Sequence, residues 1–323
     1  MQAVSVIATV LNEAGEIGRL VSSLLEQNPP AREVIVVDGG STDGTWEWLE
    51  EAAHRNPTLR PIRDESCSLK NSPGPIARGR NVAIAAATSP LIACTDAGCA
   101  YAPEWLSRLT APLAEGKAEY SLGGSCLDLA DATVWDLASA PFFGVRLDPL
   151  EPNKSCTARS MAFTRDLWLR IGGFPESVFF GEDTLFDLKA RSLAQPAFVE
   201  NAKAIYRPQY GLRSACRQLA SYAASDGILG VRRTRLFRNA ARCLIQIAAL
   251  LVIPLTVLPL IAILALQLHF AFHPDWRQLR RKGVRALAAR LLFSVLVPWM
   301  IVIGHLRGWL TRKDLPNRQN RSN

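Results

Sequence analysis

The stretch VIVVDGGSTDGTW, residues 34–46, decides the fold class of this chain of 323 residues. Its first four residues are apolar and mostly β-branched, which is typical of a strand buried on both faces. An acidic, glycine-rich turn follows, and we expect a helix from Trp46 to Ala53, with Asp43 able to cap its exposed amides. Ligands of an open α/β sheet bind outside the carboxyl ends of its strands. The carboxylates of Asp38 and Asp43 suit a base edge and a ribose hydroxyl better than a bare phosphate.

The flanking segments complete a strand–helix–strand unit. Residues 4–11 are expected to form a strand, and residues 16–27 an amphipathic helix that Pro29 and Pro30 end. Three such elements within about 35 residues predict a parallel sheet with a right-handed crossover. Further strands are expected at 58–63, 91–95, 118–127 and 156–164, and further helices at 77–87, 103–113 and 181–193. Residues 198–206 are expected to close the soluble part. The predicted fold class is therefore α/β with a mostly parallel sheet flanked by helices.

Charge divides the chain into two parts. Residues 1–200 carry 17 Lys and Arg against 26 Asp and Glu, a net charge of −9, whereas residues 201–323 carry 20 against 3, a net charge of +17. The basic part also contains long apolar runs. An acidic α/β part joined to a basic, apolar part predicts an enzyme attached to an anionic membrane. Nucleic acid is the rival partner for a basic part, but a membrane is favoured because the arginines flank apolar runs and no nucleic-acid-binding module is recognisable.

Two apolar runs are candidates for membrane segments. Residues 243–266 carry no charge and would be about 36 Å long as a helix, whereas residues 291–306 span a bilayer only if 286–290 is included, with Arg290 reaching toward the head groups. We expect two crossings. The alternative is a re-entrant hairpin bent at Pro254 and Pro259, which would keep every basic cluster on the cytosolic side.

Cysteine usage indicates a reducing compartment. The seven cysteines are scattered, without paired spacing or accompanying histidines, which favours reduced thiols and argues against zinc. The first eleven residues lack a basic region and hold the first expected strand, so no secretory signal is predicted.

Polar side chains recur where the expected strands end. Each has a structural explanation when taken alone, since an acidic residue at a helix start caps amides or complements the helix dipole. Their order within one strand–helix–strand framework points instead to a shared site. The set comprises Thr9 with Asn12 and Glu13, Asp38 with Asp43, Asp96, and Glu182 with Asp183. Arg80 and Asn81 lie between them, at the start of the helix before Asp96.

This order resembles the family 2 glycosyltransferases, inverting enzymes with the GT-A fold. The resemblance rests on four segments that together span about 180 of the 323 residues: VSVIATVLNE (4–13), VIVVDGGSTDGTW (34–46), GRNVAIAAATSPLIACTDAGC (79–99) and IGGFPESVFFGED (171–183).

The resemblance implies a role for each candidate. Asp183 would be the general base, with Glu182 beside it, since an acceptor hydroxyl must lose its proton as it attacks the anomeric carbon. The nucleotide-sugar site would be formed by Thr9, Asn12, Glu13, Asp38, Gly40, Asp43, Arg80 and Asp96. The acceptor side would include Gly172, Gly173 and Phe174.

One position departs from the family pattern. The family usually carries a D-x-D motif whose last Asp binds Mg²⁺ or Mn²⁺, but Gly98 stands there in this chain, which leaves Asp96 as the metal ligand. We therefore expect weaker metal dependence, with Arg207, Arg213 or Arg217 supplying positive charge to the leaving group. Contact with lipid head groups is an equal explanation for these arginines.

The sequence thus predicts an inverting glycosyltransferase at the cytosolic face of the cytoplasmic membrane, with a nucleotide-sugar donor and a lipid-linked or cell-envelope acceptor. The expected domains are a catalytic domain (1–206), a basic juxtamembrane segment (207–242), two membrane segments (243–306) and a basic tail (307–323). The alternatives are an inactive membrane scaffold, suggested by Gly98, and a sugar nucleotidyltransferase, disfavoured because no G-x-G-T-R loop follows the first strand.

Overall fold

The computed structural model describes residues 2–147, 157–252, 261, 265 and 276–313. The described residues form two compact units, one of residues 2–128 with the described part of 144–208, and one of residues 129–143 with the described residues from Gln209 onward. The first unit carries every residue expected in the catalytic, nucleotide-sugar and acceptor sites, whereas Arg213 and Arg217 belong to the second unit. Its strands are β1 (Val4–Val10), β2 (Glu33–Asp38), β3 (Leu59–Arg63), β4 (Leu91–Cys94), β5 (Cys99–Tyr101), β6 (Tyr120–Leu122), β7 (Ser125–Leu127), β8 (Met161–Thr164), β9 (Ala197–Phe198) and β10 (Ala204–Tyr206). Its helices are α1 (Ile17–Leu25), α2 (Thr45–Arg55), α3 (Pro75–Ala86), α4 (Trp105–Ala114), α6 (Arg165–Ile171) and α7 (Glu182–Leu193).

The larger sheet has seven strands in the order β3-β2-β1-β4-β8-β6-β9. The pairs β1–β2, β2–β3, β1–β4 and β6–β9 are parallel, whereas β8 runs antiparallel to both β4 and β6. The β1–α1–β2 unit expected from the sequence is present, and the mostly parallel α/β sheet is confirmed. Because β1, β2 and β4 are parallel neighbours, their carboxyl ends meet at one edge of the sheet.

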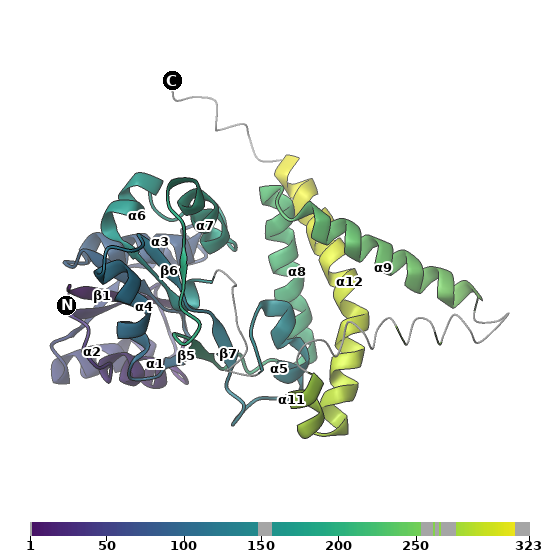
Figure 1. Ribbon diagram of the computed structural model, residues 1–323, viewed down its shortest axis with the longest axis horizontal. Helices are drawn as coiled ribbons and strands as arrows, with labels where there is room; N and C mark the ends of the chain where they lie inside the picture. Colours follow the sequence, from purple (N-terminus) through teal and green to yellow (C-terminus); the bar gives the residue numbers. More distant parts are fainter. Residues whose placement is uncertain (1, 148–156, 253–260, 262–264, 266–275, 314–323) are drawn as a thin grey trace. The chain divides into compact units, whose positions relative to one another are not determined.

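Helices cover both faces of this sheet, as Figure 1 shows for α3, α6 and α7 on one side and for α1 and α2 on the other. Alternate residues of β1 enter different cores, with Val6 packed among residues of α1, α2 and α4, and Ile7 among residues of α3, α6 and α7. Both faces are therefore apolar, which explains the unbroken apolar runs of the central strands.

The strand expected at 118–127 is divided between two sheets. Its residues form β6 in the large sheet and β7 in a second sheet of order β5-β10-β7. The break falls at Gly123, where a Cβ atom would lie 1.8 Å from the carbonyl oxygen of Ala202, so only glycine allows that backbone approach. The prediction of one continuous strand was wrong here because the local pattern carries no sign of this long-range contact. Residues 198–206 likewise contribute to both sheets, through β9 and β10.

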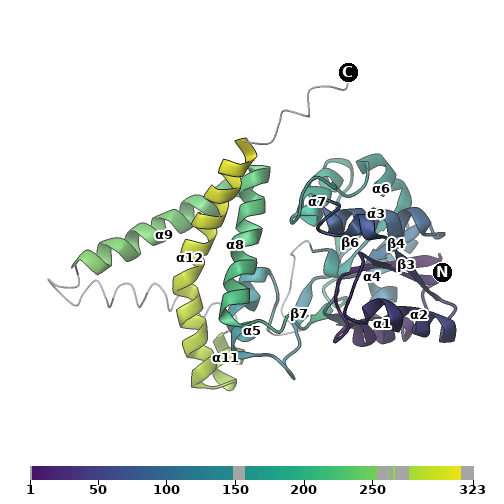
Figure 2. The same cartoon turned by 180° about the vertical axis from the view of Figure 1, so that it is seen from behind.

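The second unit is helical and consists of α5 (Val134–Ser139), α8 (Leu212–Leu229), α9 (Arg233–Val252), α11 (Trp276–Arg281) and α12 (Val284–Lys313). The sequence has helical spacing over residues 212–238, but α8 ends at Leu229 because the next residue, Gly230, has a φ of +68° in the left-handed region. Helices α8 and α12 run side by side (Figure 2). Small residues allow this contact, since a Cβ atom on Gly308 would lie 1.9 Å from the carbonyl oxygen of Ala224.

One expectation about the membrane segments needs correction, and another concerns residues that lie mostly outside the described part. Arg290 does not reach outward: it is 1% exposed and donates to the carbonyl oxygen of Leu137 on α5 at 2.6 Å, because a helix end offers carbonyl groups there. The first apolar run, 243–266, is described only to residue 252 and at residues 261 and 265. Pro254 and Pro259 lie outside the described residues.

Candidate active site

The loops after β1 and β2 are joined by hydrogen bonds at the carboxyl edge of the sheet. The backbone N–H of Asn12 donates to Ser41 Oγ, and the side-chain oxygen of Asn12 accepts from the N–H of Thr42 at 2.9 Å. The N–H of Glu13 donates to Thr45 Oγ1 at 2.8 Å. Asn12 has a φ of +57°, which asparagine tolerates better than most residues. These contacts make one rigid rim from two loops that are about thirty residues apart.

Asp43 belongs to this rim and serves the backbone. One carboxylate oxygen accepts from the N–H of Ala14, and the other accepts from the N–H and the hydroxyl of Thr45. These hydrogen bonds, chiefly the one from the Thr45 hydroxyl, lower the pKa of Asp43. The N-cap of α2 is Gly44, so Asp43 stabilises the helix start from the preceding position. Both carboxylate oxygens of Asp43 thus have protein partners.

The two carboxylate oxygens of Asp38 differ in their hydrogen bonding. One accepts from backbone N–H groups, and the other has no hydrogen-bond partner in the part of the chain that the structure describes. Its Oδ1 accepts from the N–H groups of Gly40 and Ser41, each at 2.8 Å. Its Oδ2 is buried and has no hydrogen-bond partner among the described residues. A buried acceptor without a donor is costly, so this oxygen is suited to a ligand N–H group.

Glu13 lies at the same edge and is protonated more readily than an ordinary glutamate. Burial raises its pKa to about 7, and the nearby carboxylates of Glu16 and Asp43 add to this shift. Thr9 lies near the end of β1 and packs closely against α3. A Cβ atom on Gly79 of α3 would lie only 2.9 Å from Thr9 Cγ2. The glycine lets α3 approach the end of β1.

Arg80 joins the second half of the site. It extends from α3 with its side chain 3% exposed and donates from Nη2 to Asp96, after β4, and from Nη1 to Glu182, the first residue of α7, at 2.5 Å in each case. The two carboxylates raise the pKa of Arg80. Burial raises the pKa of Glu182 to about 7, opposed by Arg80 and reinforced by Asp183. The arginine thereby fixes the end of β4 against the start of α7.

Asp183 differs from Glu182 in its surroundings. Glu182 is 5% exposed and held by Arg80, whereas Asp183 is half-buried and accepts from the N–H of Thr184. The structure thus brings Arg80, Asp96, Glu182 and Asp183 together. Phe174 adjoins the same group, since the Arg80 guanidinium carbon lies 5.4 Å from the centre of its ring. Gly172 and Gly173 precede it with φ values of +82° and +81°, a turn that other residues adopt only with strain.

Comparison with known proteins identifies the family. The model of glycosyl transferase family 2 matches residues 5–170, slightly more than half of the chain. The chain belongs to this family. The glycosyltransferase AglE of Haloferax volcanii is 26% identical over 199 residues, 58% of this chain and 60% of that protein. The succinoglycan biosynthesis protein ExoU of Rhizobium meliloti is 38% identical over 106 residues, 33% of this chain and 29% of that protein. This chain thus spans less than two thirds of the length of either curated relative.

Solved structures support the same fold. The mannosyltransferase PcManGT from Pyrobaculum calidifontis, in complex with GDP-Man and Mn²⁺, matches with a TM-score of 0.62 at 22% identity, over 91% of this chain and 87% of that chain. A crystal structure of S. aureus TarS in complex with UDP-GlcNAc matches with a TM-score of 0.50 at 18% identity, over 97% of this chain and 92% of that chain. At these identities the likeness establishes the GT-A fold of this family 2 member.

The residues near Asp96 can hold a divalent cation only with help from a ligand. Among the described residues, no group of three or more His, Cys, Asp and Glu side chains could hold a metal ion. Asp96 has one oxygen bound to Arg80 and a side chain that is 32% exposed, and Gly98 offers no carboxylate. One carboxylate together with a diphosphate and waters is a donor set that Mg²⁺ accepts. The residues present therefore fit a divalent cation that takes one ligand from Asp96 and its other ligands from the diphosphate and water.

Sequence reasoning missed an ion-pair ring beside this edge. Arg207, singled out for the leaving group, is paired with Glu16 and Asp128, each at 3.5 Å, and Arg19 pairs with the same two carboxylates at 3.6 and 2.8 Å. The N–H of Arg207 also donates to the carbonyl oxygen of Gly98. Nothing in the local pattern around Asp128 indicated this ring. Arg213 and Arg217 lie on α8, in the helical unit.

Proposed function

We propose that this chain is an inverting glycosyltransferase that moves a sugar from a nucleoside-diphosphate donor to a hydroxyl of a lipid-linked or cell-envelope acceptor. The observation that carries the proposal is the Arg80 bridge, because it holds Asp96 and Glu182 together and so places the start of α7 at the carboxyl edge of the sheet. Membership of glycosyl transferase family 2 supports the same reaction class.

The donor site is assigned to the rim formed by the first two loops. The free Oδ2 of Asp38 accepts from a ring N–H of the base, which uracil, guanine and thymine all offer. Thr9, Asn12, Glu13, Gly40 and Asp43 shape the nucleoside pocket around it, and Arg80 and Asp96 face the ribose and diphosphate. When bound, a divalent cation held by Asp96 would neutralise charge on the diphosphate.

Asp183 is the general base in this proposal. Its half-buried carboxylate takes the proton of the acceptor hydroxyl as that oxygen bonds to the anomeric carbon, and the bond from that carbon to the diphosphate oxygen breaks with its electron pair leaving on the diphosphate. Attack from the face opposite the leaving group inverts the carbon. Glu182 holds Arg80 instead, because its own carboxylate is buried and paired. Gly172, Gly173 and Phe174 form the acceptor side.

The helical unit supports a position at the membrane. Residues Val284–Thr311 of α12 form the candidate membrane span among the described residues. An 18-residue window within them has a mean hydropathy of 2.2, and 44% of that window is buried. At 1.5 Å per residue the 28 residues of the span extend about 42 Å, enough to cross a bilayer.

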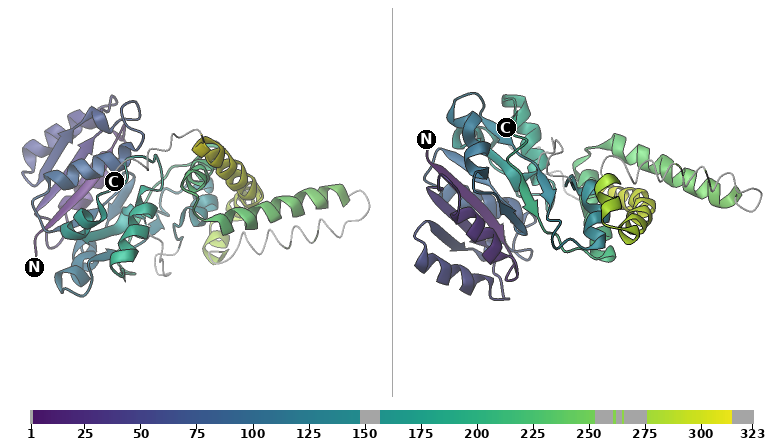
Figure 3. Two further views of the ribbon diagram at one scale, coloured as in Figure 1. Left: turned by 90° about the horizontal axis from the view of Figure 1, so that it is seen from above. Right: turned by 60° about the horizontal axis from the view of Figure 1, so that its bottom comes forward.

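Helix α9 is the green helix that Figure 3 shows from two further directions. From Arg242 to Leu250 it has the polarity expected of a helix in lipid, with polar residues buried and large apolar residues exposed. Arg242 and Gln246 are 9% and 7% exposed and hydrogen-bond to α12, where Trp299 donates to the Gln246 side chain at 2.6 Å. Leu244 and Leu250 are 66% and 67% exposed. Arginines at the start of α9 would lie near anionic head groups. We place the catalytic unit on the cytosolic side, next to a lipid-linked acceptor.

The decisive experiment replaces the proposed base. Asp183→Asn protein is compared with wild type and with Asp166→Asn, an exposed aspartate of α6, using UDP- and GDP-sugars and membrane extracts as acceptors. We expect Asp183→Asn to lose about 1,000-fold in transfer while UDP and GDP bind as in wild type, because the base acts only in the transition state. Retained transfer would remove Asp183 from this role. A wild-type protein that binds no nucleoside diphosphate and turns over no donor would support the scaffold alternative that Gly98 suggests.

A further inference from the structure

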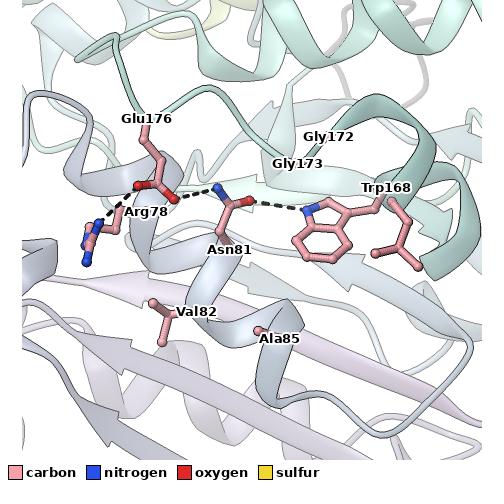
Figure 4. A pocket seen from close by; sticks show the side chains of 9 residues that line it. Arg78, Asn81, Val82, Ala85, Trp168, Gly172, Gly173 and Glu176 are labelled. Atoms are coloured by element: carbon pink, nitrogen blue, oxygen red, sulfur yellow. Dashed lines mark hydrogen bonds and ion pairs between the residues drawn. The ribbon is translucent and has the colours of Figure 1, made fainter. Parts of the chain in front are cut away.

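The loop between α6 and α7 is held by two side chains of α3. Arg78 forms an ion pair with Glu176 at 3.2 Å, and Asn81 makes four hydrogen bonds to the loop and to the end of α6. Its Nδ2 donates to the carbonyl oxygen of Phe174 at 2.9 Å and to Glu176 Oε1 at 2.8 Å. Its Oδ1 accepts from the N–H of Phe174 at 2.9 Å and from Trp168 Nε1 at 3.2 Å. Figure 4 shows Asn81 between Glu176 and Trp168, beside an open cavity of about 360 Å³. Both hydrogens and both acceptor directions of the amide are thus used.

The backbone at this loop depends on close approach to α3. Gly173 has a φ of +81°, and a Cβ atom on it would lie 3.1 Å from Asn81 Oδ1. At the start of α3, a Cβ atom on Gly74 would lie 2.6 Å from the carbonyl oxygens of Glu176 and Val178. The loop therefore approaches α3 closely at two glycines. The Arg78–Glu176 ion pair is partly exposed, with side chains 41% and 39% exposed, whereas Asn81 binds the backbone of Phe174 on both its N–H and its carbonyl side.

Asn81 binds both the N–H and the carbonyl oxygen of Phe174. The ring of Phe174 in turn contacts Arg80, in the group of residues that we take as the reaction centre. This ring is 2% exposed and stacks on Phe186 of α7 with centroids 4.4 Å apart and planes at 16°. The Arg80 guanidinium carbon lies 5.4 Å from the same ring, within the range of a cation–π contact. Arg80 in turn bonds to Asp96 and Glu182. A contact path thus leads from Asn81 through Phe174 to Arg80.

We propose that Asn81 is a positioning residue, which holds Phe174 against Arg80 and thereby sets the guanidinium between the end of β4 and the start of α7. The inference rests on the proposed function, because it takes that group of residues to be the reaction centre. Asn81 itself touches neither donor nor acceptor in this account. Its contribution is to keep the reaction centre within the narrow tolerance that transfer requires.

The test is the isosteric change Asn81→Asp. The new carboxylate can still accept from the Phe174 N–H, but it cannot donate to the Phe174 carbonyl oxygen, and it repels Glu176. The matched control is Asn56→Asp, because the Asn56 amide also donates to a backbone carbonyl oxygen, that of Ala52, at the end of α2. Each variant is measured for exchange of backbone hydrogens, for binding of UDP and GDP by calorimetry, and for kcat and KM with any donor that the wild type turns over.

We expect Asn81→Asp to lower kcat about 100-fold while the Kd for nucleoside diphosphate changes less than about threefold, since the nucleoside rim lies on other loops. Exchange in residues 172–186 should rise about tenfold, with residues 9–45 unchanged. In Asn81→Asp/Glu176→Gln, the Gln amide can donate to the new carboxylate, and part of the lost kcat should return. A purely structural residue would instead lower thermal stability and all kinetic parameters together, without rescue.

The hydrogen-exchange arm separates this inference from the proposed function. If exchange in residues 172–186 is unchanged, or if kcat matches that of the Asn56→Asp control, Asn81 is not a positioning residue. If the wild type turns over no donor, the proposed function fails, while localised loosening of the same residues would still support the positioning role and unchanged exchange would still overturn it.

Discussion

The guanidinium of Arg80 bonds to the carboxylate of Glu182 at 2.5 Å across 102 residues of sequence, inside a protein interior where both side chains are less than one tenth exposed. This ion pair decides how the two acidic residues at the start of α7 can be used. Glu182 is buried and paired with Arg80, whereas Asp183 is half-buried. The roles that we propose for the two residues follow from this difference in burial, since a carboxylate that is buried and paired cannot exchange protons with an incoming alcohol as one at the edge can.

Removal of Arg80 should destabilise the catalytic unit strongly. Arg80→Met leaves the buried carboxylate of Glu182 without its partner, and the expected loss is about 3–5 kcal/mol of unfolding free energy. Arg80→Lys should lose less, because the charge remains but an ammonium group does not match two carboxylates as the planar guanidinium does. Urea unfolding measures both. Arg55→Met, which removes an exposed pair with Glu51, serves as the control and should change stability by less than about 1 kcal/mol. Equal losses in the two methionine variants would contradict the burial argument.

Stability should fall as the pH rises because of Glu13. Its pKa is about 7 in the folded protein against 4.5 for an ordinary glutamate, so the folded state binds more protons between these values. The contribution of Glu13 is therefore complete below about pH 4.5 and is lost as the pH passes through 7. Glu13→Gln should flatten this part of the profile. Urea midpoints of both proteins at pH 5, 6, 7 and 8 provide the measurement, and identical slopes would show that Glu13 does not titrate in this range.

Metal dependence should increase when the missing carboxylate is restored. Gly98 has a φ of +69°, which aspartate tolerates better than most residues, and a Cβ atom there would lie 3.4 Å or more from its neighbours. Gly98→Asp should therefore fold and bind Mn²⁺ together with UDP or GDP at least about tenfold more tightly, since a second carboxylate joins the cation. Calorimetry with and without EDTA measures this effect, and Gly98→Asn is the uncharged control. If wild-type transfer stops completely in EDTA and returns with Mn²⁺, charge from arginines does not replace the cation.

The close pairing of α8 and α12 should tolerate no side chain at Gly308. A Cβ atom there would overlap the carbonyl oxygen of Ala224, and the same holds at Gly304 with Ala220. Gly308→Leu should separate the helices and cost at least about 1–3 kcal/mol, which thermal unfolding of the full chain in detergent would detect. Gly211→Ala is the control, because its nearest neighbour, Ser214 Oγ, would be 3.9 Å from the new atom. A stable Gly308→Leu protein would show that the contact is looser than described.

The candidate site was predicted in part because its residues follow strands that the apolar pattern makes evident. Residues 34–46 alone place Asp38 at a strand end and a helix behind it, and parallel pairing of β1, β2 and β4 then brings Thr9, Asp38 and Asp96 to one edge. The sequence could not show that both oxygens of Asp43 serve backbone and side-chain groups of the rim, since their donors lie in another loop and in the first turn of α2. Nor could it show the ring that joins Arg207 and Arg19 to Glu16 and Asp128.

The sequence by itself determined the α/β class and the reaction family, and it predicted the edge of the sheet where the polar candidates gather, because hydrophobic periodicity and short motifs are local properties. Tertiary structure decided that Glu182 at the start of α7 is buried and paired with Arg80, whereas Asp183 beside it is half-buried. Pairing and burial depend on contacts such as those of Arg80 with Glu182 and of Asn81 with Phe174, which join segments about one hundred residues apart and have no local signature.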